Sequence, residues 1–354
     1  MSALLPLLQA RLRAEGPMTV AEYMMLCLQH PQHGYYTTRD PLGVAGDFTT
    51  APEISQMFGE VLGLCLGQCW LDQGRPARFV LAELGPGRGT LMADALRALR
   101  SVPGFLDAAE LHLVESSQHL RAEQASRLQG AAPVWHDGLD TLPEAPLYLL
   151  ANEFFDALPV RQFLRDGAGW RERVIGLRED QLAFGLTEVT PQAVLEPRLA
   201  DTQDGDLVER CAPAEALTGE IGRRIAEQGG AALIVDYGSD RSLGDTLQAV
   251  RAHAKVPVLA DPGQADLTAH VDFGALARAA APACASGAVP QGVFLERLGI
   301  TQRAQALARR LDGAALQSHI AAHRRLTHPD EMGRLFKVLG LHPRSAPPPP
   351  GLTE

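Results

Sequence analysis

Long apolar runs, lysines and paired cysteines are all scarce in this chain. The nearest candidates for a membrane span, Val61–Trp70 and Ala145–Ala151, are shorter than the roughly 18 apolar residues that a bilayer requires, so no membrane insertion is expected. Residues 1–16 lack a basic region followed by a long apolar stretch, so no secretory signal is expected. The five cysteines are odd in number and show no C-x-x-C spacing. This favours a reducing compartment and predicts neither a disulfide framework nor a metal site.

Positive charge is also in short supply. The chain has 32 basic residues, of which only Lys255 and Lys337 are lysines, against 42 acidic residues, and its formal net charge is −10. An acidic chain without a basic block is untypical of a nucleic-acid binder, so no nucleic-acid partner is expected. The length of 354 residues allows two domains, or one α/β domain with large insertions.

Residues 1–75 carry apolar stripes at helical spacing and are expected to form an N-terminal helical segment. A helix is predicted from about Pro52 to Trp70, with Thr50 and Glu53 spaced as a capping box. The glycine-containing segment Gly43–Glu53 could fold over a binding site as a lid.

Short apolar runs then alternate with helical segments. Four buried strands are predicted, and a helix over Thr90–Arg100 follows the first of them; the strands are Arg78–Leu84, Leu111–Val114, Pro133–Trp135 and Pro146–Leu150. This alternation predicts an α/β fold, with a doubly wound parallel sheet covered by helices on both faces.

Two insertions are expected in this core, which would span residues 76–345. In the first, at about residues 160–213, apolar and polar residues alternate over Arg161–Leu186, which predicts antiparallel hairpins. A helix near Ala214–Gln228 and a strand over Ala231–Val235 precede the second insertion, at about residues 239–290. Short strands are predicted at Val293–Arg297 and Leu335–Leu339, and the Pro-rich residues 346–354 are expected to be a disordered tail.

A glycine loop follows the first predicted strand, in the order Glu83-Leu84-Gly85-Pro86-Gly87-Arg88-Gly89. Glycines permit a tight turn and a close approach of the backbone to a ligand. The G-x-G-x-G spacing differs from the G-x-G-x-x-G of dinucleotide sites, and Glu83 would repel a pyrophosphate. An acid here suits a ligand with an ammonium group, such as the methionine half of S-adenosylmethionine. We therefore predict that Glu83, Gly85, Gly87 and Gly89 bind this cofactor.

Acidic residues also end the next two predicted strands. Glu115 stands where an acid commonly binds ribose hydroxyls, although it lies 30 residues after Gly85 and not about 20. Asp137 follows Trp135 at the place where an adenine ring would be met. Either acid could instead be an ordinary turn residue, and this alternative is stronger for Asp137 because Gly138 follows it.

The fourth predicted strand runs into Asn152, Glu153 and Asp156, which would face the methyl donor beyond the carboxyl end of the sheet. Two converging carboxylates suit a guanidinium group, which is planar and pairs with carboxylates in bidentate fashion. The alternative is a helix start, with Asn152 as N-cap and acids in the first turn. His270 could serve as a base or have a structural role, and Asp272 could simply cap a following helix.

Taken together, these blocks resemble the MidA family. The resemblance rests on Gly34-Tyr35-Tyr36, on the block from Gly46 to Glu60, on Glu83–Thr90, on Asn152–Val160, on Asp236-Tyr237-Gly238 and on Ala265–Phe273. It implies a class I methyltransferase sheet with insertions, S-adenosylmethionine as cofactor, and similarity to protein arginine methyltransferases that act in assembling respiratory complex I. It also implies a donor site at the glycine loop, Glu83 and Glu115, and places Asn152, Glu153 and Asp156 nearest the methyl group.

The resulting hypothesis is a bacterial cytoplasmic protein-arginine methyltransferase whose partner is a protein carrying the target arginine. A mitochondrial matrix location is the alternative. Two other functions stay open: a non-catalytic assembly factor that holds S-adenosylmethionine, and a small-molecule methyltransferase. A dinucleotide oxidoreductase is disfavoured by the glycine spacing. The oligomeric state, the target arginine and the degree of methylation do not follow from the residues.

Overall fold

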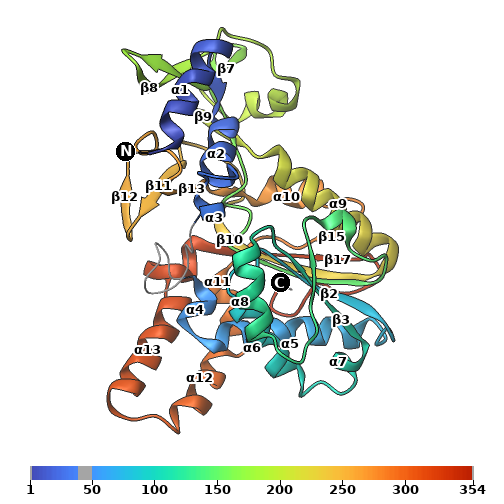
Figure 1. The fold of residues 1–354 in the computed structure, drawn as a ribbon. Helices are drawn as coiled ribbons and strands as arrows, with labels where there is room; N and C mark the ends of the chain where they lie inside the picture. The colour runs from blue at the N-terminus through green and yellow to red at the C-terminus, as the bar shows by residue number, and fades with distance from the viewer. Residues whose placement is uncertain (1, 39–49, 353–354) are drawn as a thin grey trace.

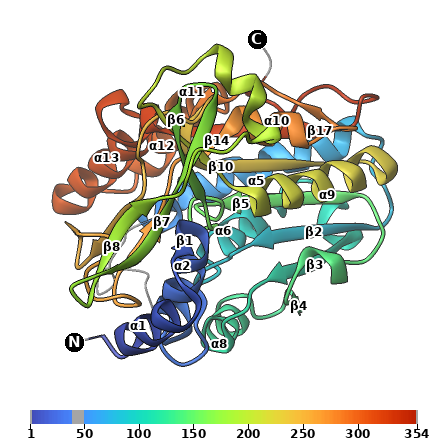
Figure 2. The ribbon, with the colours of Figure 1, turned by 90° about the horizontal axis from the view of Figure 1, so that it is seen from above.

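A nine-stranded sheet forms the centre of the molecule (Figures 1 and 2), in a computed structural model that describes residues 2–38 and 50–352. Its main strands run in the order β17-β10-β5-β2-β3-β4, with β15 beyond β17. These strands are β2 (Phe79–Leu84), β3 (Ala109–Val114), β4 (Val134–His136), β5 (Leu147–Asn152), β10 (Gly230–Ser239), β15 (Cys284–Ala285) and β17 (Phe336–His342). The five strands from β10 to β4 are parallel to their neighbours and β17 is antiparallel. The predicted α/β doubly wound fold is therefore confirmed.

The register places the carboxyl ends of the parallel strands at one edge. Leu84 of β2 pairs with both Val114 of β3 and Ala151 of β5, and Asn152 pairs with Val235 of β10. The side chains that follow these positions therefore converge, as expected for ligand sites of open α/β sheets.

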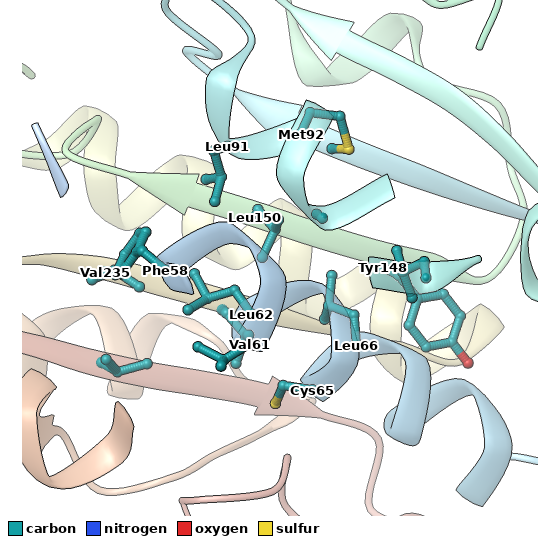
Figure 3. Packing of buried hydrophobic residues seen from close by; sticks show 14 of the residues in the cluster. Phe58, Val61, Leu62, Cys65, Leu66, Leu91, Met92, Tyr148, Leu150 and Val235 are labelled. Atoms are coloured by element: carbon teal, nitrogen blue, oxygen red, sulfur yellow. The ribbon is translucent and has the colours of Figure 1, made fainter. Parts of the chain in front are cut away.

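Helices cover both faces of the sheet because successive strand residues point to opposite sides. Leu81, Tyr148 and Leu233 pack on one face, where α5 (Gln56–Asp72) and α6 (Thr90–Leu99) lie. Figure 3 shows Leu62 and Leu66 of α5 beside Leu150 and Tyr148 of β5. The other face is covered by α9 (Ala212–Gln228) and α10 (Phe273–Ala279). Two short strands complete the nine, since β14 (Val271–Asp272) pairs with β10 and β16 (Val289–Pro290) pairs with β17. Around the sheet lie α7 (Phe105–Ala108), α8 (Gln118–Arg127), α12 (Ile300–Ala308) and α13 (Gly313–Thr327).

The helix predicted from Pro52 to Trp70 is in fact two helices, α4 (Ala51–Ile54) and α5. Ser55 between them is extended, and its hydroxyl accepts a hydrogen bond from the amide of Met57. The predicted capping box is wrong, since the Thr50 side chain makes no capping bond. The Glu53 carboxylate instead accepts a hydrogen bond from the Thr90 hydroxyl, which ties α4 to the glycine loop side of the sheet.

The first insertion contains the predicted hairpins, here β6 (Arg161–Asp166), β7 (Gly169–Arg178) and β8 (Gln181–Leu186). They form a sheet with β1 (Met18–Thr19) and β9 (Leu207–Arg210), while β11 (Gln248–Arg251), β12 (Ala254–Val256) and β13 (Asp266–Thr268) form a smaller one. Helices α1 (Leu4–Glu15), α2 (Val20–Gln29) and α3 (Tyr35–Thr38) lie with these sheets (Figure 1). We call these helices and two sheets the second lobe.

The second lobe has a hydrophobic core of its own, which includes Leu8, Tyr23, Ile175 and Leu267. The described part of residues 1–75 is mainly helical, as predicted, but its helices divide between two cores. Helices α1 to α3 bury their apolar faces against the inserted strands, whereas α4 and α5 pack against the main sheet.

Two predictions near the C-terminus are also corrected. The strand predicted at Val293–Arg297 lies in helix α11 (Gln291–Arg297), whereas the one at Leu335–Leu339 is present as β17. Residues 346–352 of the expected disordered tail pack against the main core: the Leu352 side chain is buried there, and the Cys65 thiol lies 3.5 Å from the carbonyl oxygen of Pro350. Among the described residues, no helix is both long and apolar enough to span a bilayer.

Candidate active site

A cavity of about 450 Å³ lies at the carboxyl edge of the main sheet, where the second lobe meets it. It is lined from the sheet by the glycine loop, by the ends of β3 and β5 and by Tyr237 of β10. The second lobe contributes Gln29, Tyr36 and Asp266. The two lobes therefore build this cavity together.

The glycine loop enters the cavity through Gly85 and Gly87. Both have positive φ, +58° and +54°, a conformation that glycine adopts without steric cost. A Cβ at Gly85 would stand 2.7 Å from Cδ2 of Phe154, so a side chain there would also displace a cavity wall. Gly89 has φ +77° but does not line the cavity, and it precedes the first residue of α6. Gly89 is the N-cap residue of α6, and its contact with the cofactor stays a prediction.

Glu83 lies on β2 just before this loop, and its side chain is almost completely buried at 2 % exposure. Its Oε2 has no hydrogen-bond partner among the described residues. Burial, with a smaller contribution from the charge of Glu115, raises the pKa of Glu83 to about 8. A buried carboxyl oxygen without a partner is costly, so the position is suited to a ligand that brings a positive charge or a donor.

Glu115 ends β3 and is held firmly in the cavity wall. Its Oε1 accepts a hydrogen bond from the amide of Ser117 (2.8 Å), and its Oε2 accepts one from Gln124 (3.3 Å). Burial raises its pKa. Asp137 also lines the cavity, but its side chain is 87 % exposed and pairs with Arg121 at 2.5 Å, which places it at the cavity mouth.

Glu153 follows β5 and has φ +49°, a strained conformation for a residue with a side chain. Its Oε1 accepts hydrogen bonds from the amide of Ala51 (3.0 Å) and the side-chain amide of Asn152 (3.1 Å). Burial raises the pKa of Glu153 to about 7. Asn152 is the last residue of β5 and caps no helix, and its own buried Oδ1 lacks a partner among the described residues.

Asp156 is buried beside a second carboxylate that the sequence analysis did not single out. Burial raises the pKa of Asp156 to about 6, against the effect of a hydrogen bond with Tyr237. The Oδ2 of Asp236 accepts hydrogen bonds from the amides of Phe155 (3.0 Å) and Asp156 (3.2 Å), so Asp236 fixes the loop that carries Asp156. Burial and the charges of Asp156 and Glu153 raise the pKa of Asp236 well above its usual range. The signal for Asp236 in the sequence is its position directly after the predicted apolar strand Ala231–Val235.

His270 does not join the other predicted site residues. It lines a different cavity, of about 480 Å³, between the first insertion and α10. Its ring lies edge-on to that of Tyr237, with centroids 5.4 Å apart, and burial lowers its pKa. The residue from the same segment that reaches the site is Asp266, and Asp272 caps α10 by accepting a hydrogen bond from the amide of Ala275.

The lid predicted over Gly43–Glu53 falls largely on residues 43–49, which lie outside the described residues. Thr50, directly after them, lines the cavity.

The cavity has a one-sided charge. Its described lining residues include Glu115, Asp137, Glu153, Asp156 and Asp266 but no lysine or arginine. Clustered carboxylates in a poorly solvated space favour cationic ligands. S-adenosylmethionine fits, because it would place a sulfonium and an ammonium group among these acids. Glu83 and Asn152 do not line the cavity themselves; each lies just before a segment that does, Glu83 before the glycine loop and Asn152 before the residues Glu153 and Phe154.

Comparison with known proteins agrees with this geometry. A family model described as "Putative S-adenosyl-L-methionine-dependent methyltransferase" matches residues 61–291. The mitochondrial protein arginine methyltransferase NDUFAF7 of Xenopus laevis is 38 % identical over 374 residues, covering 97 % of this chain and 85 % of the relative. The human protein of that name is 38 % identical over 365 residues, with coverages of 95 % and 82 %.

A solved structure is similar over nearly the whole chain. It comes from Burkholderia thailandensis, is bound to S-adenosyl-homocysteine, and superposes with a TM-score of 0.81 at 28 % identity, covering 99 % of this chain and 93 % of the other.

Proposed function

Because the chain belongs to this family of S-adenosylmethionine-dependent methyltransferases, we propose that it transfers a methyl group to an arginine side chain of a partner protein. The observation that carries the proposal is the cavity itself, in which carboxylates from the ends of several strands converge without a lysine or arginine among the described lining residues. The name of the mitochondrial relatives, protein arginine methyltransferase, supports the same substrate class.

The glycine loop side of the cavity would hold the cofactor. Gly85 and Gly87 allow the backbone to approach it, Glu115 offers a carboxylate for ribose hydroxyls, and Glu83 offers a buried carboxyl group that a cationic ligand would ionise. When bound, S-adenosylmethionine supplies an electrophilic methyl group on a positively charged sulfur.

The opposite side would hold and deprotonate the substrate. A guanidinium presents five N–H donors in one plane, which several fixed carboxylate oxygens can accept. The nitrogen that gains the methyl group must release one proton. Glu153 is a suitable acceptor, because a pKa of about 7 lets it take up a proton near neutral pH. The hydrogen bonds from Ala51 and Asn152 hold the Glu153 carboxylate in one orientation. These two bonds therefore contribute to the reaction by positioning the proton acceptor.

We test the proposal by transfer of labelled methyl groups from S-adenosylmethionine into a lysate of cells that lack the gene. The wild-type protein should label a protein band, and the mapped residue should be arginine. The Gly87→Val variant should label nothing, because a β-branched side chain would enter the cavity at a residue with positive φ. Gly130→Val is the matched control: Gly130 also has positive φ, but a Cβ there meets nothing within 4 Å.

Donor binding without transfer to any protein would contradict the proposal and favour the non-catalytic assembly factor. Transfer only to small molecules would favour the small-molecule methyltransferase. The substrate protein that the family resemblance favours is a respiratory complex I subunit or its bacterial counterpart, with the bacterial cytoplasm as location and the mitochondrial matrix as alternative. Mass spectrometry of complex I subunits, with and without the gene, tests this part separately.

A further inference from the structure

Asp266 is the acidic residue that the second lobe contributes to the cavity lining. It is the first residue of β13 and is only 6 % exposed. Pairing of β13 with β11 fixes its direction, since Val250 stands opposite Asp266 and Gln248 stands opposite Thr268. The carboxylate therefore reaches the cavity from a strand and not from a free loop.

Tyr36 orients this carboxylate. Its hydroxyl donates a hydrogen bond to Oδ1 of Asp266 over 2.9 Å, and Tyr36 lines the same cavity from helix α3. A second bond ties this part of the lobe to the main site, because the amide of Ala269 donates to the carbonyl oxygen of Asp156 over 3.0 Å. The segments that carry Asp266 and Asp156 are thus held in a defined relation across the junction of the lobes.

We propose that Asp266 binds the substrate guanidinium opposite Asp156, with Tyr36 as its positioning residue. The inference rests on the proposed function. A planar guanidinium has donors on more than one edge, so carboxylates from two sides can hold it, whereas the single ammonium of a lysine has no such plane. The second lobe is then part of the substrate site, and arginine is selected between the lobes. Within the segment Ala265–Phe273, Asp266 lines this cavity, whereas His270 lines the other one. Asp266 is therefore the residue of this segment that can contact the substrate.

The test compares Asp266→Asn and Tyr36→Phe with wild type in two measurements. The first is calorimetric binding of N-acetyl-arginine amide to protein saturated with S-adenosylhomocysteine, with N-acetyl-lysine amide as the comparison. The second is methyl transfer to the protein substrate identified by labelling, resolved into kcat and KM. Asp261→Asn is the matched control, since Asp261 lies in the same lobe but is 44 % exposed and pairs with Arg251.

Asp266→Asn should weaken binding of the arginine amide and raise KM by about tenfold or more, the loss expected for one hydrogen bond to a charged group. Tyr36→Phe should give a smaller loss in the same direction. Affinity for S-adenosylhomocysteine should change less than twofold in both, which separates the effect from misfolding. Asp261→Asn should match wild type throughout.

Unchanged KM and unchanged arginine-amide affinity in Asp266→Asn would overturn the inference, while labelling of an arginine by wild type would leave the proposed function standing. Loss of S-adenosylhomocysteine binding in both Asp266→Asn and Tyr36→Phe would also overturn it, because the pair would then support the fold and not the substrate. A wild-type protein that labels no arginine would overturn the proposed function, and this inference with it.

Discussion

Individual buried acids in the cavity and directly beside it have strongly perturbed pKa values. Glu83, Glu153 and Asp156 all have raised pKa values, of about 8, 7 and 6, and in each case burial is the main cause. Below these values the groups carry protons and the cavity is less negative. A cationic ligand favours the ionised forms, so its binding must release protons.

We therefore predict that affinity for S-adenosylmethionine rises between pH 5.5 and 7.5. The increase can reach about tenfold per pH unit for each proton released. S-adenosylhomocysteine lacks the sulfonium charge and should show a weaker dependence. Calorimetry in buffers of different ionisation enthalpy measures the number of protons released when the ligand binds. Glu153→Gln should reduce this number, and its side-chain oxygen can still accept the hydrogen bond from the amide of Ala51. Affinities that do not vary with pH would show that these acids are already ionised.

The same pKa values predict how the stability of the ligand-free protein changes with pH. An acid whose pKa is higher in the folded than in the unfolded state favours folding in its protonated form. Its contribution to the free energy of unfolding is fully present below the pKa of the unfolded state and is lost as the pH rises to the pKa of the folded state. For Glu83 the loss extends from about 4.5 to about 8. The cofactor site is thus kept at a cost to stability near neutral pH, as is common at functional sites.

Among the helices and strands, those with a strong pattern could be predicted from the sequence. The strands β2, β3, β5 and β10 are apolar runs that end at glycine or acidic residues, and the hairpins β6 to β8 alternate with period two. The strand predicted at Val293–Arg297 is wrong because a short apolar run does not distinguish a strand from a buried helix. In the structure, Phe294 and Leu295 are buried on one side of α11.

The site could be predicted only in part, and for a related reason. Glu115, Glu153 and Asp156 follow strands that the sequence defines, so their convergence follows from the parallel sheet. Asp266 lies on a strand of three residues whose direction depends on tertiary pairing. The sequence therefore could not decide whether Asp266 or His270, four residues later, faces the cavity.

The C-terminal segment is a stabilising element, and it gives a prediction. Leu352 is 6 % exposed and belongs to the core that includes Phe294 and Leu295. Leu352→Ala should lower the free energy of unfolding by about 2–4 kcal/mol, because it leaves a cavity in a packed core. Leu335→Ala, at a side chain that is 48 % exposed, is the control and should cost far less. Equal midpoints in urea unfolding for both variants would mean that the segment does not pack in solution.

For the molecule as a whole, the important feature is that two cores meet at one site. The core of the second lobe joins helices from the N-terminus to strands inserted more than a hundred residues later, while the main sheet has separate cores on its two faces. The residues proposed to bind the donor belong to the sheet, and Tyr36 and Asp266 belong to the lobe. Local loosening of the lobe should therefore affect the substrate side before the donor side.

Leu8→Ala tests this separation. Leu8 is 2 % exposed in the core of the second lobe, and its truncation should destabilise that core by about 2–5 kcal/mol. Amide hydrogen exchange should then become faster in β7, β11 and β13, while β2 and β5 keep their protection, because they belong to the other cores. Leu7→Ala is the control on the same helix, since Leu7 is 47 % exposed. Donor affinity should survive in Leu8→Ala while KM for the protein substrate rises. Uniformly faster exchange in all strands would instead show that the two lobes unfold as one cooperative unit, and the substrate and donor sides would then be lost together.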